Sequence, residues 1–298
     1  MLGASRSASS TDVTLKIGNT GRAIQNGVVY QCFGPFPLPA ARKLYRFLPE
    51  VDMGILHHMI MYGGRAGTPC GGGRIWYAWA RTGQSEPIGL NFEEHGSGLG
   101  YEVGRDFASV SLQVHYQQLR SATPVADYSG VRLWFAPVAP TQPLQTTIIL
   151  SYKINIPPRT YYDECVVCRV RRGGTVVAWR NHAHRLARDV WSDHLAPDGR
   201  RLPPIGNLSA QEPQIIRFLP QPVTLAAGST LQLHCMYDAR NMTSTTRMGA
   251  DERYYESALP VIESRYSWRA AAAQSHSLLG RPFSPLVLLW PSLRRRFS

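Results

Sequence analysis

The stretch FASVSLQVHY at residues 107–116 alternates polar and apolar side chains from residue 109 onward. Successive side chains of a β-strand point to opposite faces, so Val110, Leu112, Val114 and Tyr116 would form one apolar face, opposite a polar one. Similar short runs, separated by clusters of Gly, Pro, Asn and Asp, recur along the chain, and long helical periodicity is absent. These patterns predict an all-β protein built from antiparallel, jelly-roll-like β-sandwiches.

The length of the chain and the position of its prolines indicate two domains. At 298 residues the chain has about twice the length of a typical domain, and its 44% hydrophobic content is enough for two packed cores. Three prolines between residues 137 and 143 interrupt the strand pattern and would stiffen a connection. We therefore predict two sandwiches in tandem, at 11–143 and 144–257, and an irregular basic tail at 258–298, where the alternation stops.

The basic excess of the chain is unevenly distributed. The net charge is +12, but residues 1–150, 151–257 and 258–298 carry +3, +4 and +5. The first two segments lack the clustered Lys and Arg that phosphate binding needs, so we expect no nucleic-acid partner. No stretch approaches the roughly 18 apolar residues of a membrane span, so we expect no integral membrane span. Residues 1–30 also lack the apolar core of a signal peptide.

Three histidines lie on predicted strands in positions that favour metal binding. In TVVAWRNHAH (175–184) a period of two would put His182 and His184 on the same face as Arg180, so that both imidazoles could reach one ion. His115 lies on the polar face of the 107–116 strand. Taken singly, each of the three also fits an ordinary surface position.

Two further candidates, His57 and His58, are adjacent in the sequence. A regular strand would send their side chains to opposite faces, so joint ligation requires a bulge or a turn, which Gly54 makes easier. Their apolar neighbours predict a buried segment, and buried imidazoles need partners such as a metal ion. Imidazole-rich sets suit copper, iron and nickel, whereas zinc more often recruits a cysteine or a carboxylate, and composition alone does not choose among these metals.

These motifs, in this order, resemble those of one family. The matching pieces are PEVDMGILHHM (49–59), WYAWAR (76–81), LQVHY (112–116), SGV (129–131) and WRNHAH (179–184). They are similar to the copper type II, ascorbate-dependent monooxygenases, and most closely to the peptidylglycine α-hydroxylating members. The resemblance covers roughly residues 11–252 and implies two β-sandwiches with one copper site on each.

The resemblance also implies a role for each candidate residue. It implies a first copper held by His57, His58 and His115, and a second, catalytic copper held by His182 and His184. Arg180 matches the arginine that pairs with the terminal carboxylate of the substrate, as a bidentate guanidinium can. Tyr30 matches a tyrosine near the first copper.

The chemistry of the family implies the cofactors and partners. Ascorbate reduces both copper ions, molecular oxygen is the co-substrate, and the Cα of a C-terminal glycine in a glycine-extended peptide is hydroxylated. A separate lyase would carry out the second step of amidation, since we find no second catalytic domain. Cys32 and Cys70 match a disulfide of the family, which implies the secretory pathway or an extracellular location.

The chain departs from the family towards its C-terminus. Where the family has a methionine as third ligand of the second copper, after an Asp-Glu pair, Arg253 follows residues 251–252, and a guanidinium cannot ligate copper. Met248 is the nearby candidate replacement. Cys168 and Cys235 keep family positions although their partners, which would lie beyond residue 252, are missing. A single altered or misread end explains all three departures. Two alternatives therefore stay open, a dopamine β-monooxygenase-like hydroxylase of a small amine and a catalytically impaired copper-binding protein.

Overall fold

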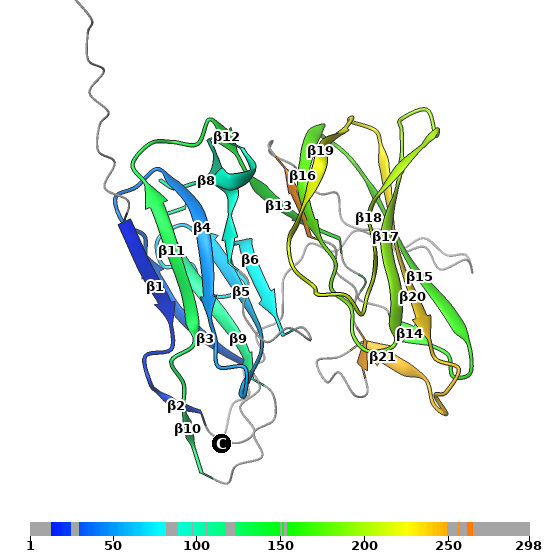
Figure 1. Cartoon of the computed structure of the whole chain (residues 1–298), viewed down its shortest axis with the longest axis horizontal. Coiled ribbons are helices and arrows are strands. Elements are labelled where there is room, and N and C mark those ends of the chain that lie inside the picture. Colours follow the sequence, from blue (N-terminus) through cyan, green and yellow to red (C-terminus); the bar gives the residue numbers. More distant parts are fainter. Residues whose placement is uncertain are drawn as a thin grey trace, which may run out of the picture. The chain divides into compact units, whose positions relative to one another are not determined.

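The protein folds almost entirely into β-strands. The computed structural model describes residues 13–24, 30–81, 89–96, 98–104, 107–116, 123–149, 151, 154–248, 255–256 and 261–264. Within these ranges the one helix is the 3-10 turn η1 (Phe92–His95), so the all-β fold class is confirmed (Figure 1). None of the described helical structure is long and apolar enough to cross a membrane.

The chain divides into two compact units, Met1–Thr146 and Thr147–Ser298. In the first unit, one sheet has the order β1 (Val13–Gly18), β11 (Gly130–Ala136), β4 (Lys43–Glu50), β8 (Leu99–Glu102) and β12 (Gln142–Pro143), and β7 (Leu90–Asn91) also pairs with β4. A second sheet has the order β3 (Tyr30–Pro37), β9 (Ser109–Tyr116), β5 (Leu56–Gly64) and β6 (Arg74–Ala80). A short ladder joins β2 (Ala23–Ile24) to β10 (Val125–Ala126). The pairs are antiparallel except β12 with β8.

Strand β9 shows why the first unit folds as a layered structure. The side chains predicted for its apolar face, Val110, Leu112, Val114 and Tyr116, are at most 1% exposed. They alternate with polar side chains on the other face, as the strand period requires. The hydroxyl of Tyr116 donates to the buried carboxylate of Asp127 at 2.6 Å, which satisfies the polar end of an otherwise apolar face.

The glycine-rich segment at residues 65–73 covers part of the polar face of β9. Ser109 and Ser111 donate from their hydroxyls to main-chain oxygens of this segment, at 2.6 and 2.7 Å. A disulfide between Cys32 on β3 and Cys70 in the segment ties the two together. The segment contains no strand, and these three links hold it against the sheet that carries His57, His58 and His115.

The second unit also has two main sheets (Figure 1). One has the order β13 (Gln145–Ile148), β23 (Val261–Ser264), β16 (Gly174–Arg180) and β19 (Arg217–Leu225). The other has the order β15 (Tyr161–Arg169), β20 (Thr230–Asp238), β17 (Ala187–Leu195) and β18 (Arg201–Ser209). A smaller sheet joins β14 (Asn155–Ile156), β21 (Thr246–Met248) and β22 (Tyr255–Glu256).

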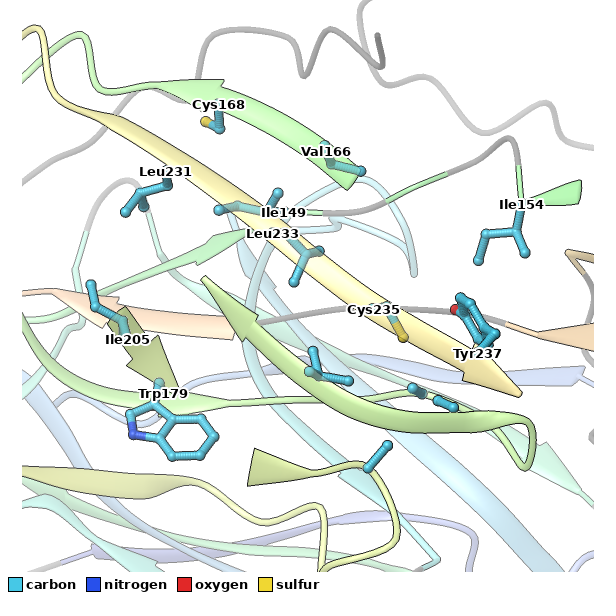
Figure 2. Close-up of a cluster of buried hydrophobic side chains, with 14 of the residues drawn as sticks. Ile149, Ile154, Val166, Cys168, Trp179, Ile205, Leu231, Leu233, Cys235 and Tyr237 are labelled. Atoms are coloured by element: carbon cyan, nitrogen blue, oxygen red, sulfur yellow. The ribbon is translucent and has the colours of Figure 1, made fainter. Parts of the chain in front are cut away.

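The core of the second unit is apolar and contains two cysteines. Val166, Leu231 and Leu233 are at most 1% exposed and pack with the side chains of the facing sheet, as Figure 2 shows. Cys168 and Cys235 lie in the same cluster, and neither forms a disulfide. These are the cysteines whose family partners we expected to be missing.

Two sequence predictions for the second unit change in detail. We expected one strand through residues 175–184, but β16 ends at Arg180, so the two histidines that follow it lie in a connection. We expected an irregular tail at 258–298, yet Val261–Ser264 form β23, which pairs with β16. The rest of that segment lies outside the described residues, and the limits 11–143 and 144–257 stay a prediction.

Candidate metal centres

A β-bulge brings the two adjacent histidines of β5 together. Leu56 pairs with Tyr116 on β9, and the next pair is His58 with His115, so the register shifts by one residue at His57. A bulge of this kind inserts one extra residue and re-aims the side chains beside it. The bulge that joint ligation requires is therefore present.

The three imidazoles of the first unit form a compact cluster. One ligand atom from each of His57, His58 and His115 lies within 4.8 Å of the other two, and the Nδ1 atoms of His58 and His115 are 3.4 Å apart. His57 and His115 are 8% and 5% exposed. His58 is partly exposed. Three imidazoles at this spacing, without a carboxylate among them, fit a copper ion, since imidazole binds both of its common oxidation states.

Tyr30 lies against this cluster. It pairs with His115 across β3 and β9, and the two rings stack with centroids 4.2 Å apart and planes inclined by 9°. The Tyr30 ring also meets that of His58 edge-on, at 5.9 Å. Tyr30, which the family resemblance predicted to lie near the first copper, therefore contacts two of the three candidate ligands, His58 and His115.

The candidate ligands of the second unit follow the end of β16. Asn181 donates its side-chain amide to the main-chain oxygens of Val190 and Gly206, at 2.8 and 2.7 Å. These bonds anchor the chain to β17 and β18 just past the last residue of β16. The imidazoles of His182 and His184 then lie with centroids 5.2 Å apart and planes inclined by 83°. The predicted pair is close together, although not because both residues belong to a regular strand.

Gln214 determines which nitrogen of His182 carries the proton. Its side-chain NH₂ donates to the main-chain oxygens of Ala183 and Ala210, at 2.6 and 3.3 Å, so its Oε1 must be the atom that faces His182. Oε1 lies 2.6 Å from Nδ1 of His182 and accepts a hydrogen bond from the N–H group at that position. In the neutral imidazole the lone pair then lies on Nε2, the arrangement in which a second-sphere amide orients a metal-binding histidine.

Arg180 is held by the same residue. It is 4% exposed, and its Nε donates to the main-chain oxygen of Gln214 at 2.7 Å. Gln214 thus positions both a candidate ligand and the candidate carboxylate-binding arginine. We did not predict this role from the sequence, because Gln214 lies more than 30 residues from either partner and only the folded chain brings them together.

Among the described histidine, cysteine and carboxylate side chains, none forms a group of three with His182 and His184 that could hold a metal ion. Met248 ends β21, but its side chain lies outside the described part, as do residues 251–253 with Arg253. The predicted loss of the methionine ligand, and its rescue by Met248, therefore stay predictions.

Comparison with known proteins shows which family of enzymes the chain is similar to. Residues 144–254 match the family model described as copper type II ascorbate-dependent monooxygenase, C-terminal domain. Similarity to curated members extends over about 80% of the chain. Over most of its length the chain is therefore similar to the copper type II, ascorbate-dependent monooxygenases, the family that its motifs resemble.

Individual relatives are distant. The peptidyl-glycine alpha-amidating monooxygenase of Mus musculus is 29% identical over 262 residues, which cover 80% of this chain and 25% of that protein. The dopamine beta-hydroxylase of Rattus norvegicus is 29% identical over 168 residues, covering 52% of this chain and 27% of that protein. The chain thus spans about a quarter of the length of these curated relatives. PNGase F, a glycosylasparaginase from Flavobacterium meningosepticum, aligns at 10% identity with a TM-score of 0.45, over 86% of this chain and 97% of that chain.

Proposed function

We propose that the protein is a copper- and ascorbate-dependent monooxygenase that hydroxylates the Cα of a C-terminal glycine in peptides, the first step of C-terminal amidation. The observation that carries the proposal is the cluster of His57, His58 and His115, the first and last of them buried, in a chain that is similar to this family over most of its length. Copper at the two sites would supply one-electron chemistry that uses molecular oxygen, with ascorbate as the reductant.

The two groups of histidines have different tasks in this proposal. His57, His58 and His115 would hold the first copper, with the ring of Tyr30 stacked on His115. His182 and His184 would hold the second, with His182 kept in the correct tautomer by Gln214. With only two imidazoles, the second site would need a further ligand to hold copper. Substitution of a ligand would therefore weaken copper binding more at the second site than at the first.

Arg180 would bind the free carboxylate of the peptide. A guanidinium is permanently charged and presents paired donors that match a carboxylate. Arg180 lies two residues before the first candidate ligand, His182. The hydrogen bond from its Nε to the main-chain oxygen of Gln214 fixes the plane of the guanidinium. A substrate anchored there by its terminal carboxylate would have its last residue close to the second site, which favours a C-terminal glycine as the reacting residue.

Hydroxylation of a small amine is the second candidate, because the chain is also similar to dopamine beta-hydroxylase. The buried arginine favours a substrate with a carboxylate. Oxygen consumption with copper and ascorbate, measured with a glycine-extended peptide and with tyramine, separates the two. We expect stimulation by the peptide, and stimulation by tyramine alone would reject the peptide substrate.

Copper stoichiometry tests the two sites directly. We expect two copper ions per chain, one in His184→Ala, and two in the control His95→Ala, which removes an exposed histidine from η1. A single copper in the unaltered chain would show that the second site is absent. Oxygen consumption no higher than that of free copper would reject the enzyme and leave the catalytically silent copper protein suggested by Arg253.

The same proposal includes the setting of the protein. A separate lyase would complete amidation of the hydroxylated peptide. The disulfide between Cys32 and Cys70 is of the kind that persists in oxidising compartments, which supports the secretory pathway or the extracellular space.

A further inference from the structure

A second cluster of reactive side chains lies on the outer face of the sheet β15-β20-β17-β18, away from the core of the second unit. His234 on β20 is directly opposite Cys165 on β15 and Trp191 on β17. Asp163 lies two residues before Cys165 and therefore on the same face of β15. The cysteine and the histidine are partly exposed, and neither belongs to the histidine groups described above.

Three side chains of this cluster are in contact in a defined order. The Oδ2 atom of Asp163 lies 2.8 Å from Nδ1 of His234, and Nε2 on the other side of the ring lies 3.8 Å from Sγ of Cys165. The carboxylate can only accept, so Nδ1 carries a proton and Nε2 is the atom that exchanges a proton with the thiol. The Trp191 ring stacks on the imidazole, with centroids 4.9 Å apart and planes inclined by 8°, and fixes its plane.

The surroundings favour a charged imidazole. The hydrogen bond to Asp163, followed by that to Cys165, raises the pKa of His234 to about 10. Asp193 on β17 also approaches, with Oδ2 3.8 Å from Nε2 of His234, and Arg201 on β18 partly neutralises it at 3.1 Å. These are the charged groups that face the pair from β15, β17 and β18.

We propose that Cys165, His234 and Asp163 form a nucleophile, a base and an orienting carboxylate, and that Cys165 is a reactive thiol which forms mixed disulfides with small-molecule disulfides. The spatial order is the one in which a base within hydrogen-bond reach activates a nucleophile and a third group holds the base. Among the described residues, the side chains whose ligand atoms lie close enough together to share a metal ion are those of His57, His58 and His115, so the cluster around His234 is not a metal site of that kind.

The proposed exchange needs no reactant other than the Cys165 thiol and the small-molecule disulfide. His234 takes the proton of the Cys165 thiol, and the thiolate attacks one sulfur of the disulfide. A new S–S bond forms to Cys165, and the S–S bond of the small molecule breaks. Its second sulfur leaves as a thiolate and receives the proton from His234. Cys165 is oxidised, and the small disulfide is reduced.

The other two cysteines outside the disulfide provide an internal comparison. Cys168 and Cys235 are 7% and 0% exposed and point into the apolar core shown in Figure 2. Burial raises the pKa of the Cys168 thiol, which keeps it protonated and unreactive. Reactivity in the folded chain should therefore be confined to Cys165.

The test is the rate at which the full chain reacts with 5,5′-dithiobis(2-nitrobenzoate) between pH 5.5 and 8.5, with glutathione as the reference thiol. At pH 6.5 we expect Cys165 to react about tenfold faster than glutathione, because a base within reach of the thiol accepts its proton as the sulfur attacks. Mass spectrometry of the labelled peptides identifies the reacting cysteine in the unaltered chain.

Variants separate activation from exposure. We expect no fast phase in Cys165→Ser, an unchanged one in Cys168→Ala, and a fall to the glutathione rate, with the ordinary rise of rate with pH, in His234→Gln. Asp163→Asn should fall between the unaltered chain and His234→Gln. Labelling of Cys165 at or below the glutathione rate in the unaltered chain, or an equal rate and pH profile in folded His234→Gln, would overturn the proposal. Neither result bears on the copper sites, so this inference and the proposed function fail separately.

Discussion

Replacing Gln214 with leucine removes the amide that orients His182 while leaving every candidate ligand in place. The side chain of Gln214 accepts from His182 and donates to two main-chain oxygens, at 2.6, 2.6 and 3.3 Å. The main-chain oxygen that accepts from Arg180 stays in the variant. The change therefore acts on the ligand and not on the proposed carboxylate site.

The expected size of the effect follows from these bonds. Loss of a side chain that orients a metal-binding histidine typically costs about 10- to 100-fold in metal affinity. We expect that loss at the second site and no change at the first, which lies in the other unit. Three hydrogen bonds worth about 1 kcal/mol each are also lost, so the free energy of unfolding should fall by about 2–3 kcal/mol.

The assay is anaerobic titration of the metal-free chain with Cu(I) in competition with a chromogenic chelator, which resolves two affinities. Gln211→Leu is the matched control, because Gln211 lies three residues from Gln214. Its side-chain amide donates one hydrogen bond, to the main-chain oxygen of Ala187 at 2.7 Å, and not to a histidine. Urea unfolding measures the stability of each variant.

Two results would refute this reasoning. Equal affinities of both sites in Gln214→Leu and in the unaltered chain would mean that the bond to Nδ1 does not orient a ligand. An equal loss at both sites, or the same loss in Gln211→Leu, would mean that the substitution acts through general destabilisation.

Two further predictions concern stability. Cys70→Ser opens a disulfide with a sequence separation of 38, for which chain entropy predicts a loss of about 4 kcal/mol in urea unfolding, and a loss under 1 kcal/mol would contradict it. Because the pKa of His234 is raised from 6.5 unfolded to about 10 folded, its stabilising effect is complete below pH 6.5 and disappears as the pH rises through 10. At pH 6 we expect Asp163→Asn to be less stable than the unaltered chain by about 1–2 kcal/mol. The value is modest because Asp163 is 39% exposed and its charge is screened by solvent. We expect this difference in stability to disappear above pH 10. A gap of equal size at pH 6 and pH 10 would contradict this explanation.

Local patterns predicted the parts of the fold that depend on the strand period. The buried face of β9 follows from alternation alone, because each side chain points opposite to its neighbour whatever the partner strand is. The sequence also showed that joint ligation by His57 and His58 requires a bulge or a turn, since adjacent side chains of a regular strand point to opposite faces, and the structure has a bulge at His57. The pairing of Cys32 with Cys70, in contrast, came from family resemblance.

Predictions that depended on where a strand ends were less accurate. The strand expected to carry His182 and His184 stops at Arg180, because Asn181 bonds to oxygens of β17 and β18 instead of continuing the ladder. β23 lies in a segment whose own pattern is irregular, and it is a strand because β16 offers it an edge. Local sequence contains no information on either partner.

By itself, the sequence determined the all-β class, the histidines available for metal and the family resemblance, since side-chain alternation and short motifs are properties of contiguous residues. Only the tertiary structure decided how the histidines meet, which tautomer His182 adopts beside Gln214, and that Cys165 faces His234. These features depend on the register between strands and on hydrogen bonds between residues 32 and 69 positions apart, which no local pattern specifies.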